Sequence, residues 1–178
     1  MSPANPNQPA PTLAEAKAQF IQLWGVSGTN WGVSKTLTQV HALLLVSSHA
    51  LSTEDIMEQL TISRGNASMT VRELIDWGLV YKELRPGERR EYFVAEKDML
   101  QVTRCIIAAR KRRELDQMKR SLDQLAALPG DATDTDYQAF HAVLADIQQL
   151  ADTSDKLLTR LMKAERSWFL DKFLKLFL

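Results

Sequence analysis

The side chains best suited to recognising another molecule lie between residues 63 and 90. Ser, Asn and Thr carry both hydrogen-bond donors and acceptors, and Arg presents a planar fork of donors that fits a phosphate or a base edge. The set consists of Ser63, Arg64, Gly65, Asn66, Ser68, Met69, Thr70 and Arg72, followed by Arg85, Arg89 and Arg90. This chemistry is that of binding rather than of bond making.

Groups that could perform catalysis or hold a metal do not form a recognisable pattern. His41, His49 and His141 have no metal-ligand spacing with one another or with Cys105, and no nucleophile-base pair or carboxylate dyad is evident. Two isoleucines follow Cys105, which favours a core thiol over a peroxide sensor. We therefore expect no enzyme activity, no metal and no cofactor.

The first group of polar side chains is predicted to lie on the second helix of a helix-turn-helix. A short helix over 53–60, a tight connection over 61–63 and a helix from Ser63 to about Trp77 follow from the capping residues and from Gly78. At about 100° per residue, Ala67 and Val71 face the core. Asn66, Ser68, Met69 and Thr70 are then candidates for base edges, and Arg72 for a base or a phosphate. The alternative is the solvated face of an ordinary helix.

The second group is predicted to lie on a β-hairpin directly after this helix. Residues 79–84 and 90–95 are β-prone, and Arg85-Pro86-Gly87-Glu88-Arg89 forms the turn. Arginines at the tip of such a wing suit the negative potential of a minor groove. The alternative is that Arg89 and Arg90 pair with Glu88 and Glu91 at an exposed hairpin.

The remaining sequence is predicted to be helical. We expect a disordered tail over 1–11, a winged helix-turn-helix domain over 12–96 and a helical dimerisation region over 97–178. The fold class is thus mainly α with a small β-hairpin wing. One helix beginning at Thr12 should be interrupted at Gly25 and Gly28, and a buried helix should run from Ser34 to about His49.

The dimerisation region should contain two long helices. The first spans 97–128 and carries a basic run, Arg104 to Arg113, which we expect mostly to pair within the protein or across the dimer. The second has apolar positions at alternating three and four residue steps, the pattern of a helix-packing seam. These positions are Phe140, Val143, Ile147, Leu150, Leu157 and Leu161, with the polar Ser154 in the same series. A homodimer is therefore predicted.

The composition of the chain indicates the compartment in which the protein works. The 178 residues have a formal net charge of zero, a single cysteine and no apolar stretch long enough to span a bilayer, so we expect a cytoplasmic protein without a membrane partner. The apolar face of residues 168–178 suits a membrane surface, but docking into the dimer core is the favoured interpretation.

Several segments of residues 24–96 together carry a family resemblance. They are Trp31-Gly32-Val33-Ser34-Lys35, Val40-His41-Ala42-Leu43-Leu44-Leu45, Ser63-Arg64-Gly65-Asn66-Ala67-Ser68-Met69 and Arg72-Glu73-Leu74-Ile75-Asp76-Trp77-Gly78-Leu79-Val80. The sequence resembles the MarR family, in particular the GbsR-like branch of regulators of glycine betaine synthesis and uptake. The resemblance implies a homodimeric transcriptional regulator with two winged lobes that bind double-stranded DNA, and terminal helices that build the dimer interface.

A small effector is also implied by the resemblance. Trp24, Trp31, Trp77 and Tyr81 could form an aromatic cage for a quaternary ammonium osmolyte such as choline or glycine betaine, although core packing is the commoner role of tryptophan. The alternative function is that of a helical interaction module whose winged domain binds protein rather than DNA. Three arginines in the wing beside an outward Asn and Met favour DNA.

Overall fold

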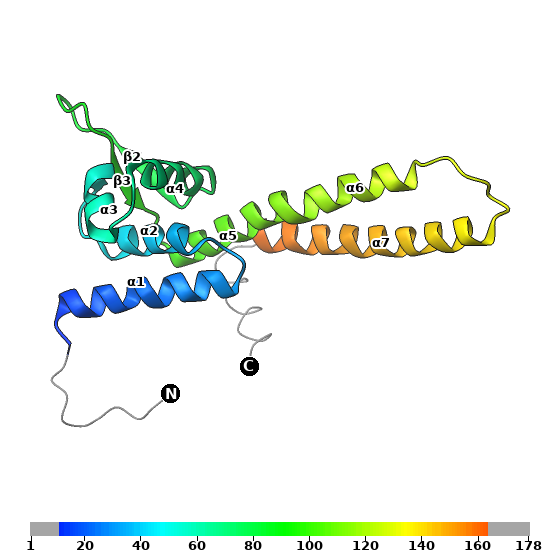
Figure 1. Cartoon of the computed structure of the whole chain (residues 1–178), viewed down its shortest axis with the longest axis horizontal. Helices are drawn as coiled ribbons and strands as arrows, with labels where there is room; N and C mark the ends of the chain where they lie inside the picture. Colours follow the sequence, from blue (N-terminus) through cyan, green and yellow to red (C-terminus); the bar gives the residue numbers. More distant parts are fainter. Residues whose placement is uncertain (1–10, 164–178) are drawn as a thin grey trace, which may run out of the picture. The chain divides into compact units, whose positions relative to one another are not determined.

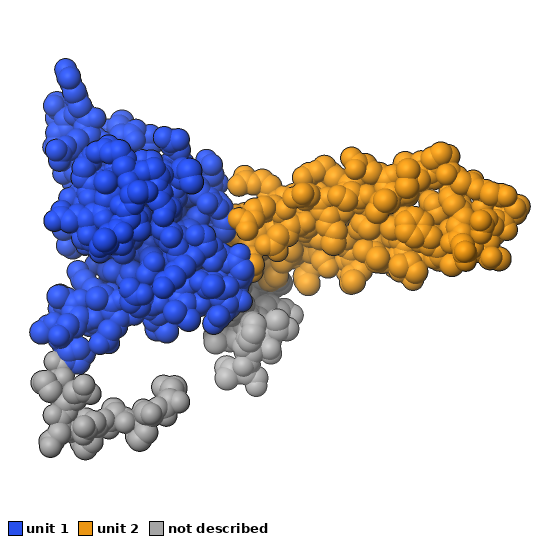
Figure 2. Space-filling model, viewed as in Figure 1, with its two compact units in different colours: residues 1–98 blue, residues 99–178 orange. Residues whose placement is uncertain are grey.

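The computed structural model describes residues 11–163, and the chain divides into two compact units, Met1–Asp98 and Met99–Leu178 (Figure 1, Figure 2). The first unit contains α1 (Leu13–Asn30), α2 (Lys35–Val46), β1 (Leu51–Ser52), α3 (Thr53–Leu60), α4 (Arg64–Asp76), β2 (Val80–Glu83) and β3 (Tyr92–Ala95). The second contains α5 (Met99–Arg110), the π-helical turn η1 (Lys111–Leu115), α6 (Asp116–Ala126) and α7 (Thr135–Lys163).

The predicted fold class, mainly α with a β-hairpin, is confirmed. The tails predicted over 1–11 and 168–178 lie outside the described residues, apart from Pro11.

Helix α1 differs from the sequence prediction because its glycines do not interrupt it. A Cβ atom at Gly28 would lie 2.1 Å from the Thr38 side chain, and one at Gly25 would lie 2.8 Å from that of Gln39. Both neighbours belong to α2, so the missing side chains let the two helices approach closely. The glycines therefore serve helix packing, and α1 continues to Asn30.

Helix α2 forms the centre of the first unit. Val40, Ala42 and Leu44 are buried, together with Ile56 from α3 and Leu74 from α4. A single large aliphatic side chain contributes about 1.5–3 kcal/mol when it is fully buried, so this cluster stabilises the helix-turn-helix.

The end of α2 is capped from a distant part of the chain. The Lys97 ammonium donates hydrogen bonds to the carbonyl oxygens of Leu44 (2.9 Å), Leu45 and Ser47 (3.1 Å). These bonds satisfy carbonyl groups that have no partner inside the helix, and they place a cation where the helix dipole favours it. The helix ends at Val46, earlier than the predicted His49.

The wing is part of a three-stranded antiparallel sheet in the order β1-β3-β2. Strand β1, which the sequence analysis did not predict, pairs Leu51 with Phe93 and Ser52 with Tyr92. The Ser52 hydroxyl also accepts a hydrogen bond from the Asp55 backbone amide at 3.2 Å and so caps α3. The base of the hairpin is thus tied to the first helix of the helix-turn-helix.

In the second unit, α7 packs against α6 through buried Leu122, Leu144 and Ala151 (Figure 1). The predicted helix over 97–128 begins at Met99, passes through η1 and ends at Ala126. Lys111 in its basic run lies 2.9 Å from the Asp116 carboxylate and 2.8 Å from that of Asp155 on α7. No helix within residues 11–163 combines the length and apolarity needed to cross a membrane.

Candidate nucleic-acid interface

The turn between α3 and α4 fixes the direction of α4. Thr61 adopts a left-handed backbone conformation with φ of 53°, which ends α3, and two residues later the Ser63 hydroxyl accepts a hydrogen bond from the Asn66 amide at 3.3 Å. Ala67 and Leu74 of α4 have no exposed surface, and Val71 is buried beside them. With this face in the core, the opposite face of α4 must point outward.

The outward face of α4 carries most of the residues predicted to read bases. Met69 has 67% of its surface exposed, Arg72 is exposed, and Asn66 and Ser68 are half-buried. A Cβ atom added at Gly65 would meet nothing within 4 Å. The first turns of α4 therefore offer side-chain donors, an apolar contact and an unobstructed stretch of backbone.

Thr70 differs from the prediction, because only 6% of its surface is exposed. It follows Ala67 by three residues and so shares the core-facing side of the helix. Its hydroxyl donates a hydrogen bond to Asn66 Oδ1 at 3.4 Å. Thr70 is thus a positioning residue that turns the Asn66 carbonyl inward and leaves the amide NH₂ group available for recognition.

In the wing, Arg85 is held against the hairpin. Its Nε atom donates to the Glu83 carboxylate at 3.0 Å, and its guanidinium lies 3.8 Å from the centre of the Tyr92 ring. The hydrogen bond to Glu83 raises the pKa of Arg85. The turn itself is closed by the Glu88 amide, which donates to the Arg85 carbonyl at 3.1 Å, and Gly87 has φ of 83°. Arg85 therefore braces the hairpin through both strands.

Arg89 and Arg90 at the tip are exposed. The neighbouring acids are engaged elsewhere. Glu91 forms an ion pair with Lys82, and the Glu88 carboxylate accepts a hydrogen bond from the Tyr92 hydroxyl and raises the pKa of Tyr92. Within residues 11–163, neither arginine has an ion-pair partner. Both guanidinium groups are available to an external anion.

Helix α4 and the hairpin form one continuous surface. A small cleft of about 70 Å³ is lined by Ser68 and Arg72 of α4 and by Lys82 and Glu91 of the hairpin. The tip of the hairpin extends beyond the body of this unit (Figure 1). The outward face of α4 and the hairpin thus adjoin each other in this unit.

Arg64 at the start of α4 is paired with Glu54 of α3, a contact that the sequence analysis missed. The pKa of Glu54 is lowered by a hydrogen bond from its own backbone amide and by its hydrogen bond from Arg64. Both side chains are largely exposed, so the pair adds little stability. The pair also fixes the orientation of Arg64, because it holds the guanidinium against Glu54 of α3. The two residues are ten positions apart and meet only through the turn, so no local spacing indicated the contact.

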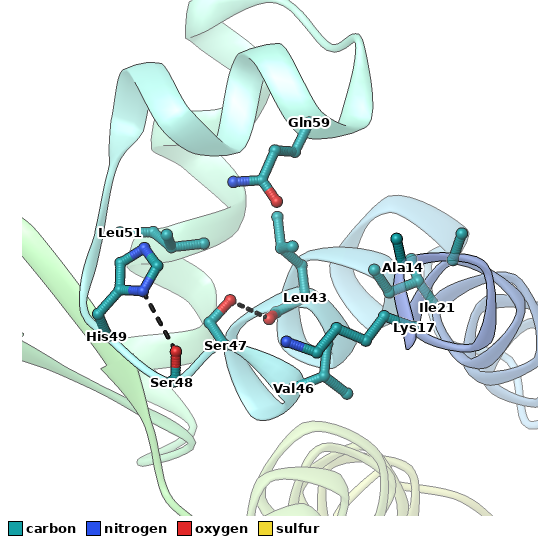
Figure 3. Close-up of a pocket in the computed structure, with 11 residues that line it drawn as sticks. Ala14, Lys17, Ile21, Leu43, Val46, Ser47, Ser48, His49, Leu51 and Gln59 are labelled. Carbon is teal, nitrogen blue, oxygen red and sulfur yellow. Dashed lines mark hydrogen bonds between the residues drawn. The ribbon is translucent and has the colours of Figure 1, made fainter. Parts of the chain in front are cut away.

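The aromatic residues predicted to form a cage lie in separate elements. The Trp24 ring stacks on Phe20 with 5.4 Å between centroids, and the Tyr81 hydroxyl donates to Glu96 at 3.0 Å. Trp31 follows α1 and Trp77 follows α4, each as the residue that caps its helix. None of the four predicted residues lines the cavity of about 350 Å³ formed by α1, the end of α2 and α3 (Figure 3).

His41 is the buried titratable group of the first unit. Only 2% of its surface is exposed, and its Nε2 atom has no hydrogen-bond partner. Burial, and to a lesser extent the charge of Lys97, lowers the pKa of His41 to about 4. The ring is therefore neutral at physiological pH and has a packing role. Among residues 11–163, no three His, Cys, Asp or Glu side chains are arranged to hold a metal ion.

Comparisons with known proteins fit this geometry. Residues 31–91 match the MarR family. The match spans the helix-turn-helix and most of the wing, and it supports the MarR family for this region. A solved structure described as a transcriptional regulator is 19% identical, covers 83% of this chain and 96% of its own, and superposes with a TM-score of 0.66. The chain therefore shares the fold of that structure, with a winged helix-turn-helix.

More distant structures also match. A MepR mutant from S. aureus bound to an oligodeoxyribonucleotide is 14% identical over 76% of this chain and 93% of its own, with a TM-score of 0.39. The multiple antibiotic-resistance repressor MarR from Listeria monocytogenes is 18% identical over 85% of this chain and 89% of its own, with a TM-score of 0.34. The comparison with curated proteins finds no match.

Proposed function

We propose that this chain is a MarR-family transcriptional regulator that binds specific sequences of double-stranded DNA as a homodimer. The observation that carries the proposal is the combination of an outward face on α4 with two wing arginines, Arg89 and Arg90, that have no ion-pair partner within the described residues. A solvated surface hairpin would be expected to neutralise these arginines with the neighbouring glutamates. Here those glutamates have other partners.

The two parts of the surface suit different parts of a DNA duplex. An α-helix fits the major groove, where the Asn66 amide can donate to a base acceptor and Met69 can contact a thymine methyl group. Arg64 and the open backbone at Gly65 suit a phosphate at the N-terminus of α4. Arg89 and Arg90 suit the narrow, negative minor groove beside it. Base contacts then specify the site, and arginine contacts supply most of the salt-dependent affinity.

The homodimer is supported by an uncovered apolar row on α7. Leu144 and Ala151 face α6 and are buried, whereas Val143, Leu150 and Leu157 of the predicted seam are 57%, 67% and 59% exposed. An extended apolar row is costly to leave in water and is typical of a protein-protein interface. One side of α7 already packs against α6 of the same chain. We therefore assign the exposed apolar row on its other side to contact with a second copy of the chain.

The dimer can be tested by light scattering. Leu150→Glu should convert the dimer to a monomer at micromolar concentration, whereas the neighbouring exposed position in Gln149→Glu should leave it intact. A single-chain mass for the unmodified protein would contradict the proposal.

The finer assignment to regulators of glycine betaine synthesis and uptake rests on the resemblance of residues 31–80. A quaternary ammonium effector would accordingly be recognised by aromatic rings, of which Trp31 is the most accessible with 66% exposure. Neither point is needed for DNA binding.

The function is tested by selection from a random pool of duplex DNA. We expect enrichment of a pseudo-palindrome whose half-sites lie about 10–10.5 base pairs apart, one helical turn. The same selection with an Arg89→Ala/Arg90→Ala variant should recover less DNA. Absence of any enriched sequence would reject sequence-specific binding and favour a winged domain that binds protein.

A further inference from the structure

An acidic side chain, Glu54, lies on the surface that we assign to DNA. It belongs to the first turn of α3, and its carboxylate accepts a hydrogen bond from the guanidinium of Arg64, the first residue of α4. The N-terminus of α3 is already capped by Ser52 and Asp55, so Glu54 is not needed for that purpose. The Arg64 and Glu54 side chains are 66% and 41% exposed, and an ion pair this open adds little to folding stability.

Glu54 also lies within range of the charge on the wing. Strand β1 pairs Ser52 with Tyr92 of β3 in antiparallel register, so Glu54 and Arg90 both follow this pair at the same end of the sheet. Hydrogen bonds from its own backbone amide and from Arg64 lower the pKa of Glu54, and the charges of Arg64 and Arg90 lower it further. The ionised carboxylate therefore acts on an arginine of α4 and on an arginine of the wing.

A carboxylate in this position has two effects on an approaching DNA duplex. Its charge repels the phosphates that Arg64 and Arg90 would attract, and it competes with them for the Arg64 guanidinium. It also holds Arg64 in one direction, so less side-chain freedom is lost when a complex requires that direction. The repulsion acts on every DNA sequence, whereas the benefit of a fixed Arg64 arises only in a complex whose phosphates are aligned with it.

We propose that Glu54 is a positioning residue that determines specificity, because it weakens attachment to random DNA more than attachment to the operator. Discrimination between two ligands is a difference of affinities, and repulsion of the unwanted ligand contributes to it as attraction of the wanted one does. The ligand that Glu54 disfavours is the phosphate backbone of double-stranded DNA outside the operator. This role rests on the proposed function.

Fluorescence anisotropy with the selected operator and with a scrambled duplex, each over a series of salt concentrations, tests this role. Glu54→Gln should tighten binding to the scrambled duplex about two- to five-fold, the range expected when an exposed ion pair no longer competes with phosphate. The salt slope on that duplex should become steeper by about 0.9 for each lobe in which the released Arg64 gains a phosphate. Operator affinity should not rise, because the lost repulsion is offset by the cost of ordering Arg64.

Matched variants separate this role from a general effect of charge. Glu58→Gln removes an equal charge from an exposed position one turn later on α3, and it should leave the ratio of the two affinities unchanged. In an Arg64→Gln background, Glu54→Gln should affect operator and scrambled duplex equally, because only the repulsion remains. Thermal unfolding of each variant verifies that it is folded.

An NMR pH titration of the side-chain carboxyl groups tests the contact itself without DNA. Because the hydrogen bond from Arg64 contributes to the lowered pKa of Glu54, Arg64→Gln should raise the pKa of this carboxyl. An unchanged pKa of Glu54 in that variant would mean that Glu54 does not hold Arg64 in solution, and it would overturn the proposal.

The DNA measurements distinguish failure of this role from failure of the proposed function. If the unmodified protein prefers no duplex, sequence-specific binding is rejected, and a role in specificity is rejected with it. If the protein prefers its operator and Glu54→Gln leaves that preference unchanged, or Glu58→Gln reduces it equally, the role of Glu54 is rejected while the proposed function stands. A preference reduced by Glu54→Gln alone supports the role.

Discussion

Replacement of both wing arginines, Arg89→Ala/Arg90→Ala, should weaken binding to operator and random DNA together. Each arginine that neutralises one phosphate contributes about 0.9 to the slope of log K against log salt concentration. Neither guanidinium has an ion-pair partner in the described part of the chain, so their removal breaks no ion pair within it. The slope should become shallower by about 2 for one wing and by about 3–4 for a homodimer.

The assay is fluorescence anisotropy of labelled operator and of a scrambled duplex, each over a series of salt concentrations. Arg89→Lys/Arg90→Lys keeps both charges and should retain most of the slope. Arg85→Gln should change it by less than about one unit, because Arg85 is engaged by Glu83 and Tyr92. An unchanged slope in the double alanine variant would refute the assignment of the wing to DNA.

Three other substitutions follow from the geometry. Asn66→Ala should cost about 1–3 kcal/mol on the operator and much less on random DNA, since we propose that the Asn66 amide reads a base; equal losses on both in the anisotropy assay would reject that role. Gly28→Ala should destabilise the protein by about 1–3 kcal/mol in urea unfolding because its Cβ would meet Thr38, whereas Gly65→Ala, with open space around it, should leave the fold intact and weaken DNA binding. Burial lowers the pKa of His41 from 6.5 to about 4 in the folded state. The neutral ring therefore makes its full contribution to the free energy of unfolding above pH 6.5, and this contribution is lost as the pH falls towards 4. Unfolding free energy should therefore fall by about 2 kcal/mol between pH 7 and pH 5, and His41→Leu should lose that component; an identical pH dependence in the variant would contradict it.

Local signals were sufficient to predict the helix-turn-helix and the hairpin. Ser63 was predicted and found to cap α4, and the position of β2 and β3 followed from the β-prone residues around the turn. These features depend on residues close together in the sequence. The same holds for the outward positions of Met69 and Arg72, which the helical period determines.

Other features depended on contacts between distant segments. Strand β1 has only two residues and exists because it pairs with β3, about forty positions later. Gly28 was expected to interrupt α1, but its role is set by Thr38 on the neighbouring helix. Likewise, the availability of Arg89 and Arg90 follows from the partners that the hairpin fold gives to the glutamates beside them.

Genomic footprinting of the protein on its own chromosome tests the central claim most directly. The geometry of α4 and the wing predicts a limited number of protected sites with dyad symmetry and half-sites about 10–10.5 base pairs apart. Asn66→Ala should weaken protection at these sites relative to the rest of the chromosome. Arg89→Ala/Arg90→Ala should reduce occupancy at every site. Protection without dyad symmetry, or a pattern that both variants leave unchanged, would contradict the assignment of this chain as a DNA-reading dimer.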